Sequence, residues 1–410
     1  MALSMEEAQR LRFEASRVFT PAAPVDEQAL FAGRTEQIVQ LLDVISQRGQ
    51  HAVIFGERGV GKTSLANMLT PWLESLGQQV VAPRVNCDGS DTFSKVWRKM
   101  LSEIQTTSQT RKPGFIRESG EEVMTAADDL RRNIAPDDIR KVFTTLGWRA
   151  LLILIFDEFD RIADPEAQRL FADTIKALSD HSVRVTMILV GVADTVDQLI
   201  REHQSIERAL VQIQMKRMRP DELGEIISKG LTRLEMTIDE EALANVVALS
   251  QGLPHYTHSL GLHASRAALD EGEKHIRMSH ADAAIRRAVQ EAQQSIRQTY
   301  HAATISPRKA TLYAHVLLAC ALAETDELGY FAAADVREPL CRITGRSYDI
   351  PNFSPHLNNL CDQTRGSILY KTGVKHRPRF RFTNPLMQPF VIMRGFAEGM
   401  IPKEILVERP

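Results

Sequence analysis

The sequence has 410 residues, too many for one ordinary hydrophobic core, so two or three domains are expected. Hydrophobic residues make up 43% and charged residues 25%, as in soluble globular proteins, and no apolar run approaches the length of a membrane span. The net charge of −2 by itself predicts no class of partner, and four widely spaced cysteines exclude a disulfide framework. The charged N-terminus does not resemble a signal peptide, so we expect a cytoplasmic protein without a membrane partner.

The first half of the chain alternates between helical patterns and continuous apolar runs. Helices are predicted at 1–18 and 34–46. Five apolar runs of the kind that parallel sheets bury follow at 51–55, 79–86, 151–156, 185–190 and 211–215. Helical patterns separate these runs at 64–73, 91–104, 136–146 and 166–178. The alternation predicts an α/β fold, with a parallel sheet and helices on both of its faces.

The segment from Gly56 to Ser64 follows the first apolar run and reads G-x-x-x-x-G-K-T, the phosphate-binding P-loop motif. Its glycines let backbone N–H groups turn inward, Lys62 can reach the β- and γ-phosphates, and the Thr63 hydroxyl can bind Mg²⁺. The following helix points its positive end at the same phosphates. The alternative is a glycine-rich turn without a ligand. The predicted nucleotide-binding residues are Gly56, Glu57, Arg58, Gly59, Val60, Gly61, Lys62, Thr63 and Ser64.

Acidic residues follow two of the other predicted strands. The run 151–156 ends in Asp157 and Glu158, and adjacent strand residues face opposite sides. Asp157 is therefore predicted to hold Mg²⁺ near Thr63, and Glu158 to polarise the water that attacks the γ-phosphate. The alternative is a surface pair that caps a loop. The next strand leads to Asp194, which could sense the γ-phosphate at the carboxyl edge of the sheet, or could cap the next helix.

The strand pattern stops near Pro220. Helices predicted at 221–234, 239–250, 256–271 and 279–299 form a small all-α domain. Further helices are predicted at 307–323, 332–343 and 354–364. Two alternating segments, 367–371 and 377–383, then bracket a turn at Gly373, and a helix at 384–396 closes the chain. Three helices followed by a hairpin is the order of a winged helix-turn-helix.

The order of P-loop, Asp-Glu strand, polar strand end and helical domain resembles AAA+ ATPases. It is most similar to the origin-recognition and replication-initiator branch and its STAND-type relatives. The segment from Phe31 to Glu36 is similar to the box upstream of the P-loop in this group, although its glutamate comes one residue early. The resemblance covers roughly 19–299 and implies ATP and Mg²⁺ as cofactors and a homo-oligomer. We divide the chain into an α/β P-loop domain at 1–218, a helical lid at 219–299 and a winged helix at 300–410.

AAA+ ATPases use arginines at two places to promote ATP hydrolysis, and this chain differs at one of them. In AAA+ oligomers one subunit inserts an arginine into its neighbour's site, and the resemblance leaves Arg201 or Arg208 for this role, with Arg208 preferred. A surface arginine without a role is the alternative for either one. Where the family's lid presents an arginine, this chain has the segment Gly252 to His255, similar to STAND proteins. The missing arginine favours a slow switch, and His255 is either a phosphate contact or a buried structural histidine.

The most basic part of the chain lies near its end. Between residues 364 and 397 there are seven lysines and arginines and no acid. A winged helix reads DNA with its third helix and touches the backbone with its wing. DNA contacts are therefore predicted at Asn359, Lys371, Lys375, Arg377, Arg379 and Arg381. The alternatives are a protein-docking module and a solvated hairpin edge.

The sequence thus predicts a Mg-ATP-dependent ATPase that works as an oligomeric switch and binds or remodels DNA. Its predicted catalytic residues are Lys62, Glu158, Asp194 and Arg208. The alternative is a STAND-like regulatory ATPase of a defence or signalling complex, whose winged helix docks a protein effector.

Overall fold

The computed structural model describes residues 3–24, 28–110, 133–145, 150–200, 206–305, 312–326, 328–374 and 377–401. They fold into two compact units. One, here called the sheet unit, comprises Pro24–Glu57 and Gly61–Lys216. The other, here called the helical unit, comprises Met1–Ala23, Arg58–Val60 and Arg217–Pro410. Among the described residues, no helix has the length and hydrophobicity needed to cross a membrane.

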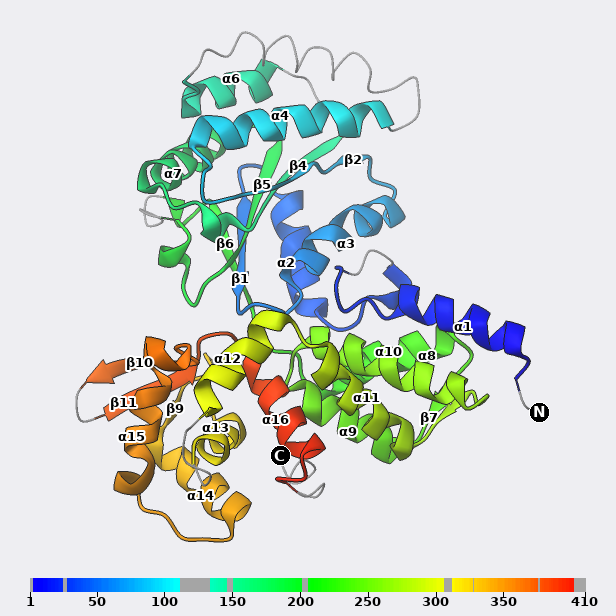
Figure 1. Cartoon of the computed structure of the whole chain (residues 1–410). Helices are drawn as coiled ribbons and strands as arrows, with labels where there is room; N and C mark the ends of the chain where they lie inside the picture. Colours follow the sequence, from blue (N-terminus) through cyan, green and yellow to red (C-terminus); the bar gives the residue numbers. More distant parts are fainter. Residues whose placement is uncertain are drawn as a thin grey trace. The chain divides into compact units, whose positions relative to one another are not determined.

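The sheet unit is built on a parallel sheet in the order β2-β4-β5-β1-β6, with β3 also paired to β4 (Figure 1). All five predicted strands are present. The predicted strand 79–86 is divided in two, because Pro83 has no backbone N–H to donate. β5 lies between the strand that leads to the P-loop and the strand that ends at Asp157. The strands are β1 His51–Gly56, β2 Val80–Val81, β3 Arg84–Asn86, β4 Leu151–Asp157, β5 Val185–Val192 and β6 Leu210–Met215.

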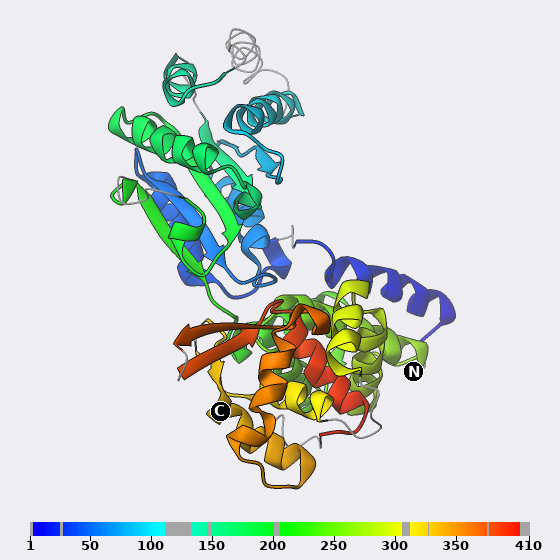
Figure 2. The same ribbon diagram turned by 60° about the vertical axis from the view of Figure 1, so that its left-hand side comes forward.

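Helices cover both faces of this sheet, as predicted (Figures 1 and 2). Alternate residues of β4 serve the two faces: Leu154 and Phe156 join the core beneath the helices of one face, whereas Ile153 and Ile155 are buried on the other. Burial on both sides explains the continuous apolar runs. One face carries α4 Phe93–Thr110, α6 Pro136–Thr145 and α7 Pro165–Asp180, and the other carries α2 Thr35–Ser46 and α3 Lys62–Ser75.

The core beneath α4 and α7 is centred on aromatic rings. Trp97 of α4 and Phe171 of α7 are stacked with ring centroids 6.0 Å apart. Phe171 also contacts Phe156 and Phe159 edge-on, at centroid distances of 5.1 and 4.9 Å. All four side chains are fully buried. Because Phe156 and Phe159 flank the acidic pair in the sequence, the cluster fixes the end of β4.

The helical unit contains the helices predicted after residue 220. The prediction of one helix over 279–299 is wrong, because the backbone at Ala292 leaves the helical conformation and a second helix follows. The region is also not purely helical, since β7 Thr237–Ile238 and β8 His275–Ile276 form a short parallel pair. The helices are α8 Pro220–Arg233, α9 Glu240–Ser250, α10 Pro254–Asp270, α11 Met278–Glu291 and α12 Gln294–Thr304.

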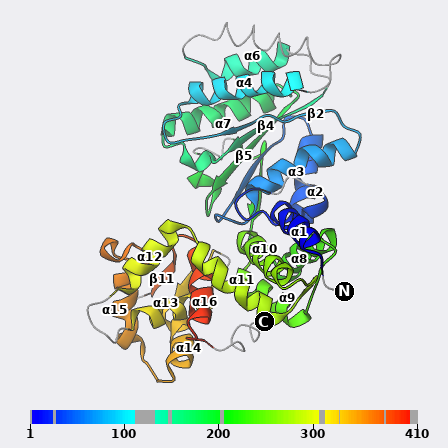
Figure 3. The same cartoon turned by 45° about the vertical axis from the view of Figure 1, so that its right-hand side comes forward.

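The N-terminal helix α1, Met5–Val18, packs along α10 in the helical unit (Figure 3). Phe19 follows α1 and is fully buried. Gly230 of α8 and Gly261 of α10 leave room for its ring, because Cβ atoms added there would lie 2.5 and 2.8 Å from Phe19. The Thr20 N–H donates to Nδ1 of His258 at 3.3 Å. Residues 1–18, assigned from sequence to the P-loop domain, therefore group with the helical unit.

The C-terminal part of the helical unit keeps the predicted order of elements. α15 begins at Ile350, earlier than predicted, with Pro351 in its first turn. β9 joins the hairpin in an antiparallel sheet of order β10-β11-β9. α16 is largely buried, and its Gln388 accepts a hydrogen bond from Arg217 at 2.6 Å. The elements are α13 Tyr313–Leu322, β9 Phe331–Ala332, α14 Ala333–Thr344, α15 Ile350–Leu360, β10 Leu369–Val374, β11 Arg377–Phe382 and α16 Met387–Ala397.

Candidate functional site

The predicted P-loop connects β1 to α3. Gly56 ends β1 with φ 148°, and a Cβ added there would overlap the carbonyl oxygen of Met215 on β6. Gly59 and Gly61 have φ of 89° and 94°, a left-handed conformation that side chains rarely adopt. The glycines of the motif are thus required by the backbone path. This path turns the loop sharply into the first residue of α3, Lys62.

Lys62 is folded back over the loop. Its side chain is buried, and the ammonium donates to the carbonyl oxygens of Gly56 at 3.0 Å and Glu57 at 2.7 Å. A buried ammonium needs such acceptors, because an unpaired charge would be strongly destabilising. Phosphate oxygens are stronger acceptors than carbonyls. The position therefore fits a cation that exchanges backbone acceptors for phosphate.

Thr63 and Asp157, which are far apart in the sequence, meet in the sheet unit. The Thr63 hydroxyl donates to Oδ1 of Asp157 at 3.3 Å, and the Glu158 N–H donates to the same oxygen at 2.9 Å. Asp157 is only 5% exposed, and its Oδ2 lies 4.0 Å from Nη1 of Arg84. A hydroxyl and a carboxylate are the oxygen donors that Mg²⁺ prefers. The two predicted metal ligands are therefore brought together.

The Glu158 side chain faces solvent, whereas that of Asp157 is buried. Glu158 has a left-handed backbone with φ 53° and begins the 3-10 helix η2, Phe159–Arg161. Its carboxylate accepts from Nη1 of Arg161 at 2.8 Å, and both side chains are more than half exposed. The next acid, Asp160, accepts from the Val192 N–H at 2.8 Å and joins this turn to the end of β5. Glu158 thus lies at the carboxyl edge of the sheet.

Asp194 follows β5, the strand between β4 and β1, so its backbone leaves the same edge of the sheet. Its N–H donates to Oε1 of Gln198 at 2.9 Å. Asp194 directly precedes Thr195, the cap residue of the following 3-10 helix, Val196–Gln198. Its place between the P-loop strand and the Asp157 strand is compatible with the predicted sensor role.

Arg208 lies at the opposite edge of the sheet. Its carbonyl oxygen accepts from Gln50 at 3.0 Å, and the His51 N–H donates to Ala209 at 2.7 Å. Both contacts lie where β1 begins, whereas the P-loop starts where β1 ends. The six residues of β1 span about 20 Å. An exposed Arg208 at this edge cannot reach its own P-loop. A role in a neighbouring subunit and a surface arginine without a role, the two alternatives from the sequence, both fit this position. Arg201 lies outside the described residues.

His255 has a structural partner. Its Nδ1 donates to the carbonyl oxygen of Pro21 at 2.7 Å, and burial lowers the pKa of the imidazole. Both groups belong to the helical unit. These contacts favour the structural role for this histidine, one of the two alternatives that the sequence left open.

The residues predicted to bind DNA fall on two different surfaces. Asn359 of α15 donates to the Tyr313 hydroxyl at 2.7 Å, and Lys371 of β10 donates to Asn358 of α15 at 2.7 Å. Arg379 of β11 instead donates to Asp326 at 3.0 Å. Lys375 lies outside the described residues. The remaining predicted contacts, Arg377 and Arg381, are on β11 with Arg379.

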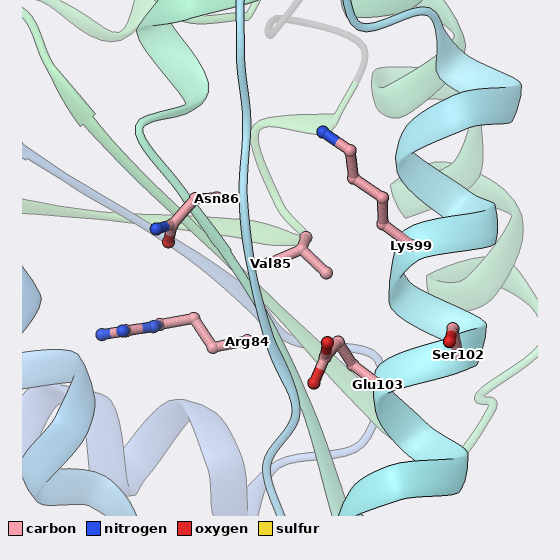
Figure 4. Close-up of a pocket in the computed structure, with 6 residues that line it drawn as sticks. All are labelled: Arg84, Val85, Asn86, Lys99, Ser102 and Glu103. Atoms are coloured by element: carbon pink, nitrogen blue, oxygen red, sulfur yellow. The ribbon is translucent and has the colours of Figure 1, made fainter.

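The sequence did not predict that the residues of β3 lie beside Asp157. These residues line an open pocket of about 410 Å³ together with α4 (Figure 4). Arg84 and Asn86 point to one side of the strand and Val85 to the other. Arg84 donates to Asn67 of α3 at 2.7 Å, which places its guanidinium near Asp157. No motif marks Arg84, and only the pairing of β3 with the end of β4 reveals it. The lining residues are Arg84, Val85, Asn86, Lys99, Ser102 and Glu103.

The Novel STAND NTPase 1 family matches residues 22–326, which is more than half of the chain. The chain belongs to this family. The match covers the P-loop, the acidic pair and the helices that follow them, so the resemblance to STAND-type NTPases is confirmed. A comparison with curated proteins finds no match.

Solved structures were compared with this STAND NTPase. The Walker-type ATPase PABY2304 of Pyrococcus abyssi is similar at 16% identity with a TM-score of 0.54, over 91% of this chain and 99% of that one. Cdc6p of Pyrobaculum aerophilum is 16% identical with a TM-score of 0.47, over 94% and 99%. The ORC2 protein of Aeropyrum pernix is 16% identical with a TM-score of 0.49, over 95% and 97%. Of these three, only the first exceeds 0.5 and supports a shared P-loop fold, which confirms the predicted α/β class.

Proposed function

We propose that this STAND NTPase hydrolyses ATP, with Mg²⁺ held by Thr63 and Asp157. The supporting observation is the hydrogen bond between these two side chains, which come from α3 and β4 and meet at 3.3 Å. Mg²⁺ bound there would neutralise charge on the β- and γ-phosphates. Lys62 would donate to the same phosphates in place of its present carbonyl acceptors.

Glu158 is the proposed general base. Its carboxylate lies at the same sheet edge as Asp157 but faces solvent, so water can reach it. The present partner of this carboxylate, Arg161, would have to release it before it could accept a proton from water. An exposed ion pair of this kind contributes less than about 1 kcal/mol, so the release costs little. Asp194, at the end of the neighbouring strand, would orient the water or sense the γ-phosphate.

The proposed ATPase works as an oligomeric switch. Arg208 is compatible with this proposal, because it lies at the sheet edge opposite to its own P-loop and could reach nucleotide only in an adjacent subunit. The lid arginine expected of fast AAA+ enzymes is absent from the segment Gly252 to His255. Turnover would therefore be slow, and the bound nucleotide would set the assembly state.

The output of the switch is binding to duplex DNA through residues 300–410, which we interpret as a winged helix. Lys371 and Asn358 are hydrogen-bonded to each other, so the hairpin and α15 present polar groups side by side. A cation beside amide groups suits a phosphate contact next to base edges. A second candidate is docking of a protein effector. It is favoured by the hydrogen bond that already occupies the amide of Asn359.

The test compares ATP hydrolysis by Lys62→Ala and Glu158→Gln with the wild type. Lys62→Ala should abolish nucleotide binding, whereas Glu158→Gln should keep binding and trap the ATP-bound oligomer. Glu166→Gln is a matched control, because Glu166 is another exposed carboxylate paired with an arginine three residues later, Arg169. Unchanged turnover in Lys62→Ala and Glu158→Gln would overturn the site assignment. Loss of turnover in Glu166→Gln as well would point to a general charge effect.

Binding to duplex DNA is tested separately, by fluorescence anisotropy at several salt concentrations. Lys371→Ala should weaken duplex binding and lower the salt dependence by about one phosphate contact. Duplex DNA that changes neither oligomer size nor ATP hydrolysis would favour the protein-docking alternative.

A further inference from the structure

The hairpin of β10 and β11 carries its arginines on one face in register with exposed residues of the other strand. Directly opposed pairs are Tyr370 with Arg381, Thr372 with Arg379, and Val374 with Arg377. Residues opposite each other in an antiparallel pair point to the same side of the sheet. We call these six residues, together with Tyr330 before β9, the outer face.

The inner side of the same hairpin is a different environment. Leu369, Phe380 and Phe382 are buried there, and Lys371 reaches across to Asn358 of α15. Side chains of a strand alternate between the two sides of a sheet. The arginines of β11 therefore cannot lie on the surface formed by Lys371 and α15. The basic hairpin offers two separate surfaces.

The outer face combines cations with aromatic rings. The Arg381 guanidinium lies 4.7 Å from the centroid of Tyr330 and 5.6 Å from that of Tyr370. Tyr370 nevertheless stays 48% exposed, and Val374 is 70% exposed. Arg379 donates to Asp326 and to the Tyr330 carbonyl oxygen at 3.0 and 2.8 Å, which holds its guanidinium beside the face. Arg379 and Arg381 are pre-positioned by these contacts, so ordering them on binding costs little entropy.

We propose that the outer face binds single-stranded nucleic acid. The arginines repeat at every second residue of β11, about 6.6–6.8 Å apart, and form a row of cations along an extended chain. The exposed ring of Tyr370, on β10 opposite Arg381, lies beside this row and can stack on an unpaired base, whereas the bases of a duplex are already stacked on each other. Charge complementarity favours a polyanion, because the six hairpin residues of the outer face include three arginines and no acid, and Asp326 pairs with only one of them, Arg379. The proposal goes beyond the proposed function and does not depend on ATP hydrolysis or on duplex binding by α15.

The experiment measures anisotropy of a labelled thymidine oligonucleotide and of a duplex of equal length with the full chain. Tyr370→Ala should weaken single-strand binding about tenfold, which equals about 1.4 kcal/mol, and Tyr370→Phe should restore it because the ring is kept. Arg377→Ala should also weaken single-strand binding. Tyr370→Ala should leave duplex affinity unchanged. Lys371→Ala, on the inner side, should weaken duplex binding and leave single-strand affinity unchanged.

Several results would overturn the proposal. Equal losses for single strand and duplex in Tyr370→Ala would mean a general basic surface. Absence of single-strand binding by the wild type would also exclude it. Polyglutamate that binds as tightly as the oligonucleotide, with a loss in Arg377→Ala but none in Tyr370→Ala, would identify an acidic protein partner. The proposed ATPase activity is tested separately, by measuring ATP hydrolysis in Glu158→Gln.

Discussion

Acid should destabilise the sheet unit through His51, the first residue of β1. Its side chain is fully buried, and its Nδ1 accepts a hydrogen bond from the Met187 N–H at 3.0 Å. Its Nε2 has no hydrogen-bond partner among the described residues. Burial lowers the pKa of His51 from 6.5 to about 4, because the imidazolium would lose its hydration without gaining an acceptor.

This pKa difference sets both the sign and the size of the effect. Above pH 6.5 the imidazole is neutral in the folded and the unfolded chain, and the free energy of unfolding is unaffected. Between pH 6.5 and about 4 only the unfolded chain binds the proton, so the free energy of unfolding falls as the pH falls. One pKa unit corresponds to about 1.4 kcal/mol, which gives a total loss of about 3 kcal/mol. Domains are stable by only about 5–15 kcal/mol, so the loss is measurable.

Urea unfolding followed by tryptophan fluorescence measures this loss. All three tryptophans of the sequence fall between residues 72 and 148, within the range of the sheet unit. His51→Asn is the matched variant, because the asparagine Oδ1 can accept the Met187 N–H and does not titrate. From about pH 7 to about pH 4, the wild type should lose about 3 kcal/mol more than the variant. Equal pH dependence of the two proteins would refute the reasoning.

Three further predictions test the loop, the helical unit and the acidic pair. Gly56→Ala should prevent nucleotide binding and lower the Tm, because its φ of 148° and the nearby Met215 carbonyl exclude a Cβ; an unchanged affinity for a fluorescent nucleotide would contradict this. Phe19→Ala should lower the free energy of unfolding by about 3–5 kcal/mol, measured by circular dichroism in urea, and a loss below about 1 kcal/mol would argue against its buried position. Arg161→Ala should change the same free energy by less than about 1 kcal/mol, because its pair with Glu158 is more than half exposed; a larger loss would be inconsistent with that exposure.

The features that sequence predicted well are those set by local pattern. The strands of the sheet unit are buried on both faces and therefore appear as continuous apolar runs. The P-loop needs its glycines for backbone reasons that any instance of the motif shares. The start of α15 could also have been predicted, because Asp349 is a typical helix cap and Pro351 is typical of a first turn. The break at Ala292 carries no such signal, because neither glycine nor proline occurs there.

Long-range contacts were beyond sequence reasoning. Nothing in the sequence indicates that Phe19 lies between Gly230 and Gly261, because that depends on how the helices cross. The residues of the basic hairpin were treated as one surface. Alternation within each strand was readable, but the register that opposes Tyr370 to Arg381 depends on the turn between the strands. The ion pair of Arg379 with Asp326 joins segments far apart in the sequence and had no local signal.

The position of Phe171 has a consequence for how the acidic pair can change. The residues on either side of Asp157 and Glu158, Phe156 and Phe159, both rest edge-on against this one ring. A smaller side chain at Phe171 would let both neighbours shift, and the two carboxylates between them would shift as well. The volume of one interior side chain and the positions of the two carboxylates are thus linked. A substitution at Phe171 would therefore change the geometry of the acidic pair as well as the stability of the core.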